Sequence, residues 1–383
     1  MELYVHLPFC VKKCRYCDFV SFPGTESRME SYVDALLREA ALNRKNCEEA
    51  IDTVYWGGGT PSLLPPHLLK KLACGLRSIL PIAAVSEWTV EANPGTITPF
   101  WLDMALENGV NRLSLGMQAA QDHLLQALGR IHRMEDTLES VRLARKAGFQ
   151  NLNLDLMFGL PGQSLTDWQH TIQIALLLEP THISGYGLIP EEGTPLFLDL
   201  ESGKLALPEV ELEREMYDLL LHAMASAGFR QYEISNFALP GFACQHNIGY
   251  WIQIPYLGLG LSSASMLSLR RTEDGLYYTR RTNTADLEGY LRSLRDGLLP
   301  VASVQNILPG EARFETMMLG LRMNQGIHET DFRRMHHRTL ESCFGPRLRM
   351  LEGRGLVTFL NGCWRLTREG MDLQNQVLVE LMD

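Results

Sequence analysis

The first 190 residues alternate short apolar runs with segments in which apolar side chains recur every three or four positions. Apolar runs of this kind are typical of buried strands, and the spaced pattern is typical of helices that cover a sheet. Alternation at this spacing predicts a parallel sheet, either open and doubly wound or closed into a partial (β/α) barrel. The predicted strands are 3–7, 53–56, 87–92, 112–116, 152–158 and 182–188, and the predicted helices are 29–44, 66–79, 99–107, 134–147 and 165–178.

The pattern changes twice after residue 190. A helix at 208–227 and a strand at 229–234 lead into a tract without charged side chains at 234–269. After residue 303, helices around 310–321, 329–343 and 348–352 precede two short strands at 356–359 and 363–366, which together resemble a winged-helix module. We therefore predict three parts: a barrel at 1–190, a barrel extension at 191–302 and a winged-helix-like α+β module at 303–383.

Composition and charge narrow the class of protein. The chain has 383 residues, of which 45% are hydrophobic and 21% charged, as in ordinary globular proteins. The net charge is −10, and residues 303–383 hold ten Arg and no Lys against ten Asp plus Glu. Phosphate binding needs an excess of basic groups. We therefore expect no nucleic-acid partner, and a winged-helix regulator is disfavoured.

Targeting signals are not evident. A strand-like segment starts directly after Met1, without the charged and apolar regions of a secretion signal. The uncharged tract is interrupted too often by proline and polar residues to span a membrane. We therefore expect a cytoplasmic protein. Transient membrane contact and homodimerisation are both compatible with this sequence.

Three of the eight cysteines, Cys10, Cys14 and Cys17, fall within eight residues after the first predicted strand. Structural zinc sites use four protein ligands, as do ordinary ferredoxin clusters. Three thiolates would leave one iron of a [4Fe–4S] cluster open to another ligand. The alternatives are chance spacing, or a zinc site completed by His6 or a distant cysteine. The scattered cysteines at 47, 74, 343 and 363 are predicted to be small buried side chains.

Further polar and glycine residues follow the predicted strands in order. Residues 57–61 form a Gly-Gly-Gly-Thr-Pro turn after the second strand, and Glu91 ends the third. Gln118 follows the fourth strand, and Asp155 lies within the apolar fifth strand. The carboxyl ends of parallel strands meet at one edge of a sheet. The sequence therefore predicts one site at this edge, next to the cysteines.

The cysteine spacing, with Tyr16 inside it, resembles the signature of the radical S-adenosylmethionine (SAM) superfamily. The resemblance implies a partial (β/α)6 barrel that holds a [4Fe–4S] cluster. It also implies that the amino and carboxylate groups of SAM bind the open iron, and that an electron from the reduced cluster cleaves SAM. An external electron donor is then expected, because the cofactors do the chemistry while the protein positions them.

The likeness extends to one family. Tyr4-Val-His-Leu-Pro-Phe-Cys10, Trp56-Gly-Gly-Gly-Thr-Pro-Ser62, Glu91-Ala-Asn-Pro94, Leu115-Gly-Met-Gln118 and Asn153-Leu-Asp-Leu-Met-Phe-Gly-Leu-Pro161 resemble the oxygen-independent coproporphyrinogen III oxidase family. The C-terminal module also resembles the corresponding part of this family. The resemblance implies a set of SAM-binding residues: Tyr4, Gly58, Gly59, Thr60, Glu91, Gln118, Arg130 and Asp155.

Two features depart from the oxidase. Phe19 stands where the oxidase has a fourth cysteine, and only nine residues precede Cys10, where the oxidase has an N-terminal extension. The haem-chaperone branch of the family carries a His-Asn-x-x-Tyr-Trp motif, which matches His246, Asn247, Tyr250 and Trp251 here. The resemblance implies that these four residues bind haem, with His246 as axial ligand and Cys244 as its rival.

Two functions follow from this resemblance. The leading hypothesis is a haem chaperone that carries a SAM-ligated [4Fe–4S] cluster and delivers haem to an acceptor protein. The alternative is a radical SAM enzyme that acts on a porphyrin-like substrate. The sequence assigns no catalytic residue, and coproporphyrinogen III oxidase activity is not expected.

Overall fold

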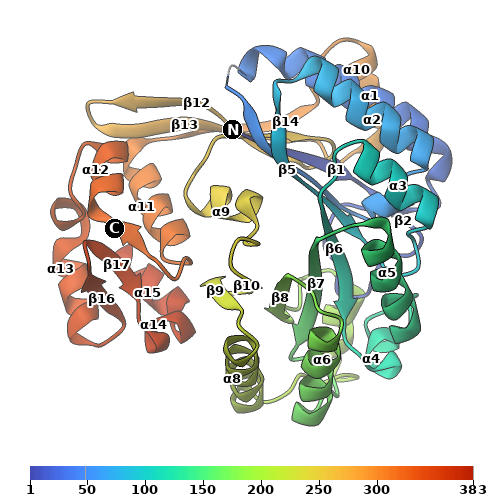
Figure 1. Cartoon of the computed structure of the whole chain (residues 1–383). Helices are drawn as coiled ribbons and strands as arrows, with labels where there is room; N and C mark the ends of the chain where they lie inside the picture. The colour runs from blue at the N-terminus through green and yellow to red at the C-terminus, as the bar shows by residue number, and fades with distance from the viewer. Residues whose placement is uncertain (48, 383) are drawn as a thin grey trace.

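Six parallel strands form the centre of a twelve-stranded sheet (Figure 1). They are β1 (Glu2–Leu7), β4 (Ile51–Gly58), β5 (Ile82–Ala92), β6 (Arg112–Gln118), β7 (Asn151–Phe158) and β8 (His182–Gly187). In this order, each of the six strands pairs in parallel with the next one. A doubly wound sheet would reverse its strand order near the middle. This order does not reverse, so the α/β fold is the predicted partial (β/α)6 barrel. The structure is a computed structural model that describes residues 1–47 and 49–382.

The outer face of the sheet is covered by the helices that connect these strands (Figure 1). They are α1 (Met29–Asn43), α2 (Pro66–Ile79), α3 (Pro99–Glu107), α4 (Asp122–Ala127), α5 (Met134–Ala147), α6 (Leu165–Leu177) and, after β8, α8 (Val210–Ser226). Three of the helices predicted in the first 190 residues have the predicted bounds, and the other two differ by one residue. Trp56, Trp88 and Trp168 are fully buried between the helices and the sheet. Their burial anchors the helical layer on the sheet.

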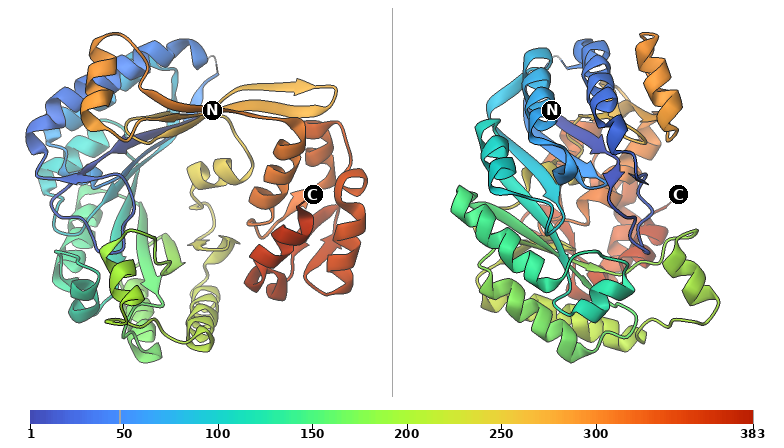
Figure 2. Two further views of the ribbon diagram at one scale, coloured as in Figure 1. Left: turned by 180° about the vertical axis from the view of Figure 1, so that it is seen from behind. Right: turned by 90° about the vertical axis from the view of Figure 1, so that its right-hand side faces the viewer.

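The sheet continues beyond the barrel on both edges. On one side, β11 (Tyr256–Leu259) pairs in parallel with β1, followed by antiparallel β12 (Ala264–Thr272), β13 (Gly275–Asn283) and β14 (Val301–Ile307). On the other side lie β10 (Asn236–Ala238) and β9 (Arg230–Glu233). The tract without charged residues contains α9 (Gln245–Trp251), a helix that the sequence pattern did not predict. Figures 1 and 2 place α9 between the barrel and the C-terminal module.

The C-terminal module has its own core and a three-stranded sheet in the order β15 (Ile327–His328), β17 (Cys363–Leu366) and β16 (Val357–Leu360). Its helices are α11 (Pro309–Gly320), α12 (Glu329–His336), α13 (Leu340–Gly353), α14 (Arg368–Asp372) and α15 (Gln374–Leu381). The β12–β13 hairpin extends across this module, and β13 contacts both α11 and α12 (Figures 1 and 2). The predicted winged-helix-like arrangement is confirmed.

One predicted helix in this module is wrong. The single helix expected at 329–343 is broken, because His337 adopts a left-handed conformation (φ 53°) that ends α12. Thr339 then caps a new helix by accepting a hydrogen bond from the backbone N–H of Ser342. The separate helix expected at 348–352 is the second half of α13.

The boundaries at residues 190 and 302 stay proposals. Strand β14 pairs with β13 across the second boundary, so we propose to move that boundary to residue 307.

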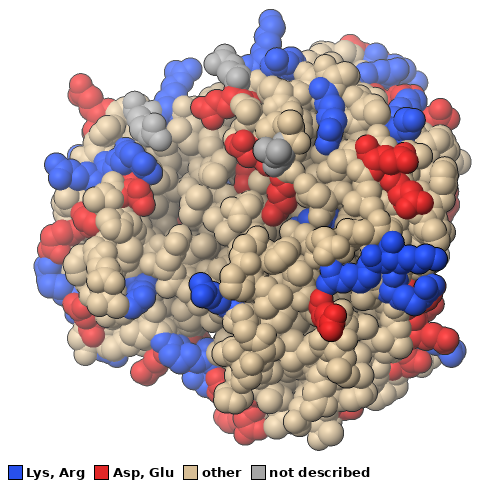
Figure 3. Space-filling model, viewed as in Figure 1, with Lys and Arg blue, Asp and Glu red and all other residues tan. Residues whose placement is uncertain are grey.

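Acidic and basic side chains both occur over the face drawn in Figure 3. Within residues 1–47 and 49–382, no helix combines the length and apolar character that a membrane crossing requires.

Candidate functional site

The cysteine loop is held by short strands and by contacts with the barrel. β2 (Phe9–Cys10) and β3 (Phe22–Pro23) pair on either side of it. The backbone N–H of Arg15 donates to Leu128 O at 2.9 Å. Cys10, Cys14 and Cys17 are half-buried free thiols. Burial, with smaller contributions from Cys14 and Cys10, raises the pKa of Cys17 to about 11.

The donor set fits an iron–sulfur cluster better than a single metal ion. Across the described residues, no three His, Cys, Asp or Glu side chains converge on one ion position. The zinc alternative needed His6 or a distant cysteine as its fourth ligand. The His6 Nδ1 pairs with the Tyr4 hydroxyl at 3.1 Å and its Nε2 with Val20 O at 2.7 Å, so both ring nitrogens are occupied. In a [4Fe–4S] cluster each thiolate binds a different iron. Three neighbouring thiols that do not converge on one point are compatible with that geometry.

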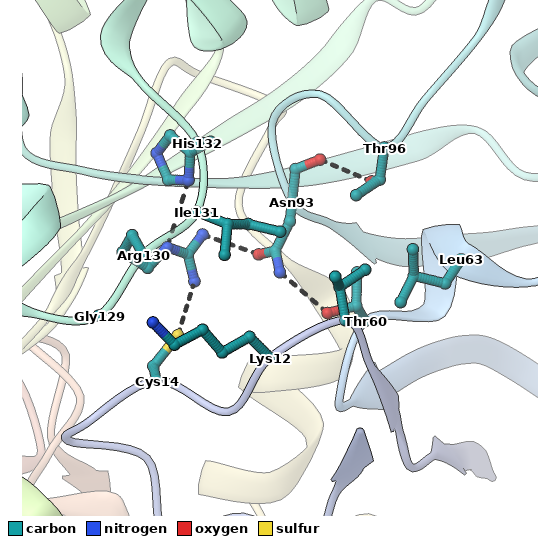
Figure 4. Close-up of a pocket in the computed structure, with 11 residues that line it drawn as sticks. Lys12, Cys14, Thr60, Leu63, Asn93, Thr96, Gly129, Arg130, Ile131 and His132 are labelled. Carbon is teal, nitrogen blue, oxygen red and sulfur yellow. Dashed lines mark hydrogen bonds between the residues drawn. The ribbon is translucent and has the colours of Figure 1, made fainter. Parts of the chain in front are cut away.

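A chain of hydrogen bonds joins the cysteines to the barrel (Figure 4). Arg130 donates through Nη2 to Asn93 Oδ1 at 2.8 Å and to Gly116 O at 2.7 Å, and its Nη1 lies 3.6 Å from Cys14 Sγ. Asn93 Nδ2 in turn donates to Thr60 Oγ1 at 2.9 Å, and that hydroxyl lies 3.7 Å from Cys10 Sγ. The guanidinium thus faces the Cys14 sulfur directly.

The glycine turn after β4 packs tightly against its surroundings. A Cβ on Gly59 would lie 2.7 Å from Phe9 O, so only glycine lets this backbone approach the cysteine loop. The Gly58 N–H donates to Glu91 Oε2 at 3.2 Å, and the Tyr55 hydroxyl donates to Glu91 Oε1 at 2.9 Å. Burial raises the pKa of Glu91 to about 7, with a contribution from Asp155. A carboxyl group at this position can therefore accept or release a proton near neutral pH.

The remaining predicted SAM residues lie at the same end of the barrel. Asp155 Oδ1 accepts from Asn153 Nδ2 at 2.8 Å, and its Oδ2 accepts from the Ser114 hydroxyl at 3.2 Å. Burial raises the pKa of Asp155. Gln118 ends β6 with φ 64°, and its amide lies beside Arg130, since a Cβ on Gly116 would be 2.9 Å from both side chains. Polar side chains with spare hydrogen-bonding capacity next to a glycine turn suit an amino-acid moiety such as that of SAM.

His246, on α9, is buried against β4 of the barrel. Its Nδ1 pairs with the Thr53 hydroxyl at 2.8 Å, and its Nε2 with the Tyr250 hydroxyl at 3.2 Å. The ring stacks on Tyr55 with centroids 5.1 Å apart. Burial, helped by Arg112, lowers the pKa of His246 to about 3, so the ring is neutral. Neither ring nitrogen is free in this arrangement, and iron ligation would require Nε2 to leave Tyr250.

Its rival Cys244 directly precedes α9. This thiol is fully buried, and it donates to Glu87 Oε1 at 3.4 Å. Burial raises its pKa to about 12, which disfavours the thiolate. Asn247 is half-buried on α9, and its backbone N–H faces the Cys244 sulfur.

Tyr250 and Trp251 line a large cavity, which we call the α9–α11 cavity. It has a volume of about 780 Å³, within the range of roughly 300–1,000 Å³ that is usual for small-molecule sites. β12, β13 and α11 form its other walls, with Met266, Tyr278 and Met318 among the lining residues. Residues 18–20, directly after Cys17, and Tyr4 form the side nearest the cysteine loop. Phe19, at the position of the oxidase's fourth cysteine, is 58% exposed there.

We compared the chain with known protein families. Residues 4–175 match the model of the radical SAM superfamily, and residues 307–373 match that of the HemN C-terminal domain. Proteins described as "Heme chaperone HemW" are similar over nearly the whole chain. The one from Bacillus subtilis is 36% identical over 98% of this chain and 97% of the relative. The one from Escherichia coli is 32% identical over 99% and 97%. The chain belongs to the HemW family of haem chaperones.

The solved structure of coproporphyrinogen III oxidase (HemN) from Escherichia coli has the same fold. Its TM-score is 0.85 over 99% of this chain and 89% of that chain, at 21% sequence identity. Membership of the radical SAM superfamily implies SAM and a [4Fe–4S] cluster as cofactors, as the cysteine spacing predicted.

Sequence reasoning missed Asn93 as a site residue. It bridges Thr60 and Arg130, and its position two residues after Glu91 at the end of β5 was the available signal. The burial predicted for the scattered cysteines holds for Cys47 but is wrong for Cys74, which is exposed. Cys343 and Cys363 are partly exposed.

Proposed function

We propose that this chain binds haem in the α9–α11 cavity and delivers it to an acceptor protein, as a HemW haem chaperone with a SAM-ligated [4Fe–4S] cluster. One observation carries the proposal. The cavity has Tyr250 and Trp251 of the His-Asn-x-x-Tyr-Trp motif on one wall and residues 18–20 of the cysteine loop on another. Flat aromatic side chains and methionines suit an apolar macrocycle.

The chain's own residues would hold the cofactors at the mouth of the barrel. Cys10, Cys14 and Cys17 would supply three thiolates, and Arg130 would stabilise that of Cys14. The eight predicted SAM residues remain the proposed SAM site, with Asn93 added because it orients Thr60. When bound, the reduced cluster supplies single electrons, so an electron donor is a further proposed partner.

His246 remains the proposed axial ligand, with a structural condition. Its Nε2 has to exchange the Tyr250 hydroxyl for iron, so the Tyr250 hydroxyl has to move away from the ring. Cys244 is the weaker candidate, since its thiol is buried against the Glu87 carboxylate. The neutral state of the His246 ring suits metal binding.

Partners and location follow as further proposals. The acceptor is proposed to be a haem protein, and transient membrane contact and homodimerisation are proposed as modes of delivery. The cytoplasm is the proposed location. Nucleic acid is not proposed as a partner.

An anaerobic haem titration followed by absorption spectroscopy tests the function. The wild-type protein with a reconstituted cluster should give a stoichiometric Soret band. His246→Ala should weaken or shift the band. The matched control is His182→Ala, because His182 is also buried with both ring nitrogens bonded, to Asn153 and Tyr232. Equal effects of the two variants would make His246 structural.

A second outcome separates the two functions. If the wild type holds cluster and SAM but no haem, the chaperone proposal is refuted. The alternative, a radical SAM enzyme with a porphyrin-like substrate, would then be tested by SAM cleavage in the presence of such substrates.

A further inference from the structure

The α9–α11 cavity contains one arginine and no lysine among the described residues that line it. This arginine is Arg280, on β13. Haem is an apolar macrocycle that carries two carboxylates, its propionates. A carboxylate in a mainly apolar cavity needs a cationic partner or exposure to water. Arg280 is therefore the side chain on which a propionate would be neutralised.

Arg280 already holds a carboxylate from the C-terminal module. Its Nη2 donates to Oε2 of Glu315 at 2.7 Å and its Nη1 donates to Oε1 at 3.1 Å; Glu315 lies on α11. Tyr278 also donates to Glu315 through its hydroxyl. The side chains of Arg280 and Glu315 are 33% and 14% exposed. This bidentate pair has the geometry in which arginine binds carboxylates best.

The pair lies next to the haem motif. Tyr256 packs edge-on against Tyr250, with ring centroids 4.8 Å apart. Arg280 also lies close enough to Tyr256 for its charge to act on the Tyr256 hydroxyl, and both side chains line the cavity. The guanidinium, Tyr256 and the motif tyrosine thus form one continuous wall of the cavity. A macrocycle in contact with Tyr250 can therefore reach Arg280 with a peripheral carboxylate.

We propose that a haem propionate replaces Glu315 on Arg280, so that the Arg280–Glu315 ion pair is a latch that haem opens. The exchange keeps the charge of Arg280 compensated, while the Glu315 carboxylate turns to water. Because Glu315 belongs to α11, loading haem breaks one of the contacts that hold the C-terminal module to the sheet. Release of haem restores it. This inference rests on the proposed haem-binding function and adds the residues that recognise the carboxylate.

The test compares iron protoporphyrin IX with its dimethyl ester, in which both propionates are uncharged. Affinities are measured by absorption titration for the wild type, Arg280→Met and Glu315→Gln, each with a reconstituted cluster. Arg280→Met should weaken haem binding roughly tenfold or more, as expected for loss of a charge-assisted carboxylate contact. Glu315→Gln should tighten haem binding several-fold, because the competing carboxylate is gone. Affinity for the diester should stay within about twofold in both variants.

Controls separate the latch from general loosening of the module. Asp218→Asn breaks a different ion pair between barrel and module, with Arg368 on α14, away from the cavity, and should leave haem affinity unchanged. SAM affinity should be unchanged in all variants, because the SAM carboxylate belongs to the cluster site. If Arg280→Met fails to fold, Arg280→Lys keeps the charge but loses the bidentate fork, and should give a smaller loss of haem affinity.

Two results would overturn the proposal. One is that Glu315→Gln weakens haem binding as much as Arg280→Met, since the intact pair would then support the site. The other is that haem and diester affinities change in parallel. In either case wild-type haem binding would still stand. Failure of the wild type to bind haem would instead refute the proposed function together with the latch.

Discussion

Glu2, the first residue of β1, is a buried carboxyl group beneath the haem motif. It is 2% exposed, and its Oε2 has no hydrogen-bond partner. It packs against Gly249 of α9, where an added Cβ would lie 1.8 Å from Oε1. Burial raises the pKa of Glu2 from 4.5 to about 8, against a hydrogen bond from Thr53 that lowers it. Replacement by glutamine keeps the shape and removes the titration.

The sign and the size of the effect of Glu2 on stability follow from the linkage between proton binding and folding. An acid whose pKa is raised in the folded state does not lower the free energy of unfolding below pH 4.5, because it is protonated in both the folded and the unfolded protein. Stability is then lost as the pH rises, until the folded pKa is passed at about 8. The difference of about 3.5 pH units, at 1.36 kcal/mol each, gives an upper bound of about 5 kcal/mol. Glu2→Gln should therefore gain stability relative to the wild type as the pH rises.

Denaturant unfolding of the cofactor-free protein at about pH 5 and about pH 8.5 measures this gain. The difference in unfolding free energy between Glu2→Gln and wild type should grow by about 2–5 kcal/mol between these pH values. Taking the difference cancels the contributions of other buried acids, among them Glu39 and Glu91, whose pKa values burial also raises to about 7. Glu107→Gln, on the exposed side of α3, is the control and should give no change. If the difference in unfolding free energy between Glu2→Gln and wild type is the same at both pH values, the reasoning is refuted.

Three further predictions concern the cofactor end of the barrel. Cys14→Ser should remove the cluster and its visible absorption, and a full iron content in this variant would contradict the ligand assignment. Asp155→Ala should weaken SAM binding roughly tenfold but leave iron content unchanged, as measured by calorimetric titration and iron assay; unaltered SAM affinity would remove Asp155 from the site. Gly58→Ala should destabilise the protein by about 2 kcal/mol more than Gly148→Ala in thermal unfolding. Both glycines have positive φ, but only at Gly58 would the new Cβ meet a side chain, 2.4 Å from His6; equal losses would mean that the clash is relieved.

Local patterns predicted the barrel well. The strand and helix bounds up to residue 190 depend on apolar periodicity and on prolines at helix starts, as at Pro66 and Pro99. Both signals act within a few residues. The break at His337 was missed because a single left-handed residue leaves no mark on periodicity.

The site was predictable where chemistry is carried by neighbouring residues. Cys10, Cys14 and Cys17 fall within eight residues of the chain, so their spacing favoured a cluster over the zinc alternative. Asn93 was missed because its role is a bridge between Thr60 and Arg130, which are distant in the chain.

The sequence by itself determined the α/β class and the family, and it predicted three cysteines as cluster ligands. These depend on local spacing and on motifs whose residues lie close together in the chain. Only the tertiary structure decided that the sheet is singly wound and that His246 is enclosed by Thr53, Tyr55 and Tyr250. It also decided that Arg280 and Glu315 meet across the cavity. The reason is physical: strand order, burial and ion pairing depend on which distant segments pack together, and one-dimensional spacing does not record that.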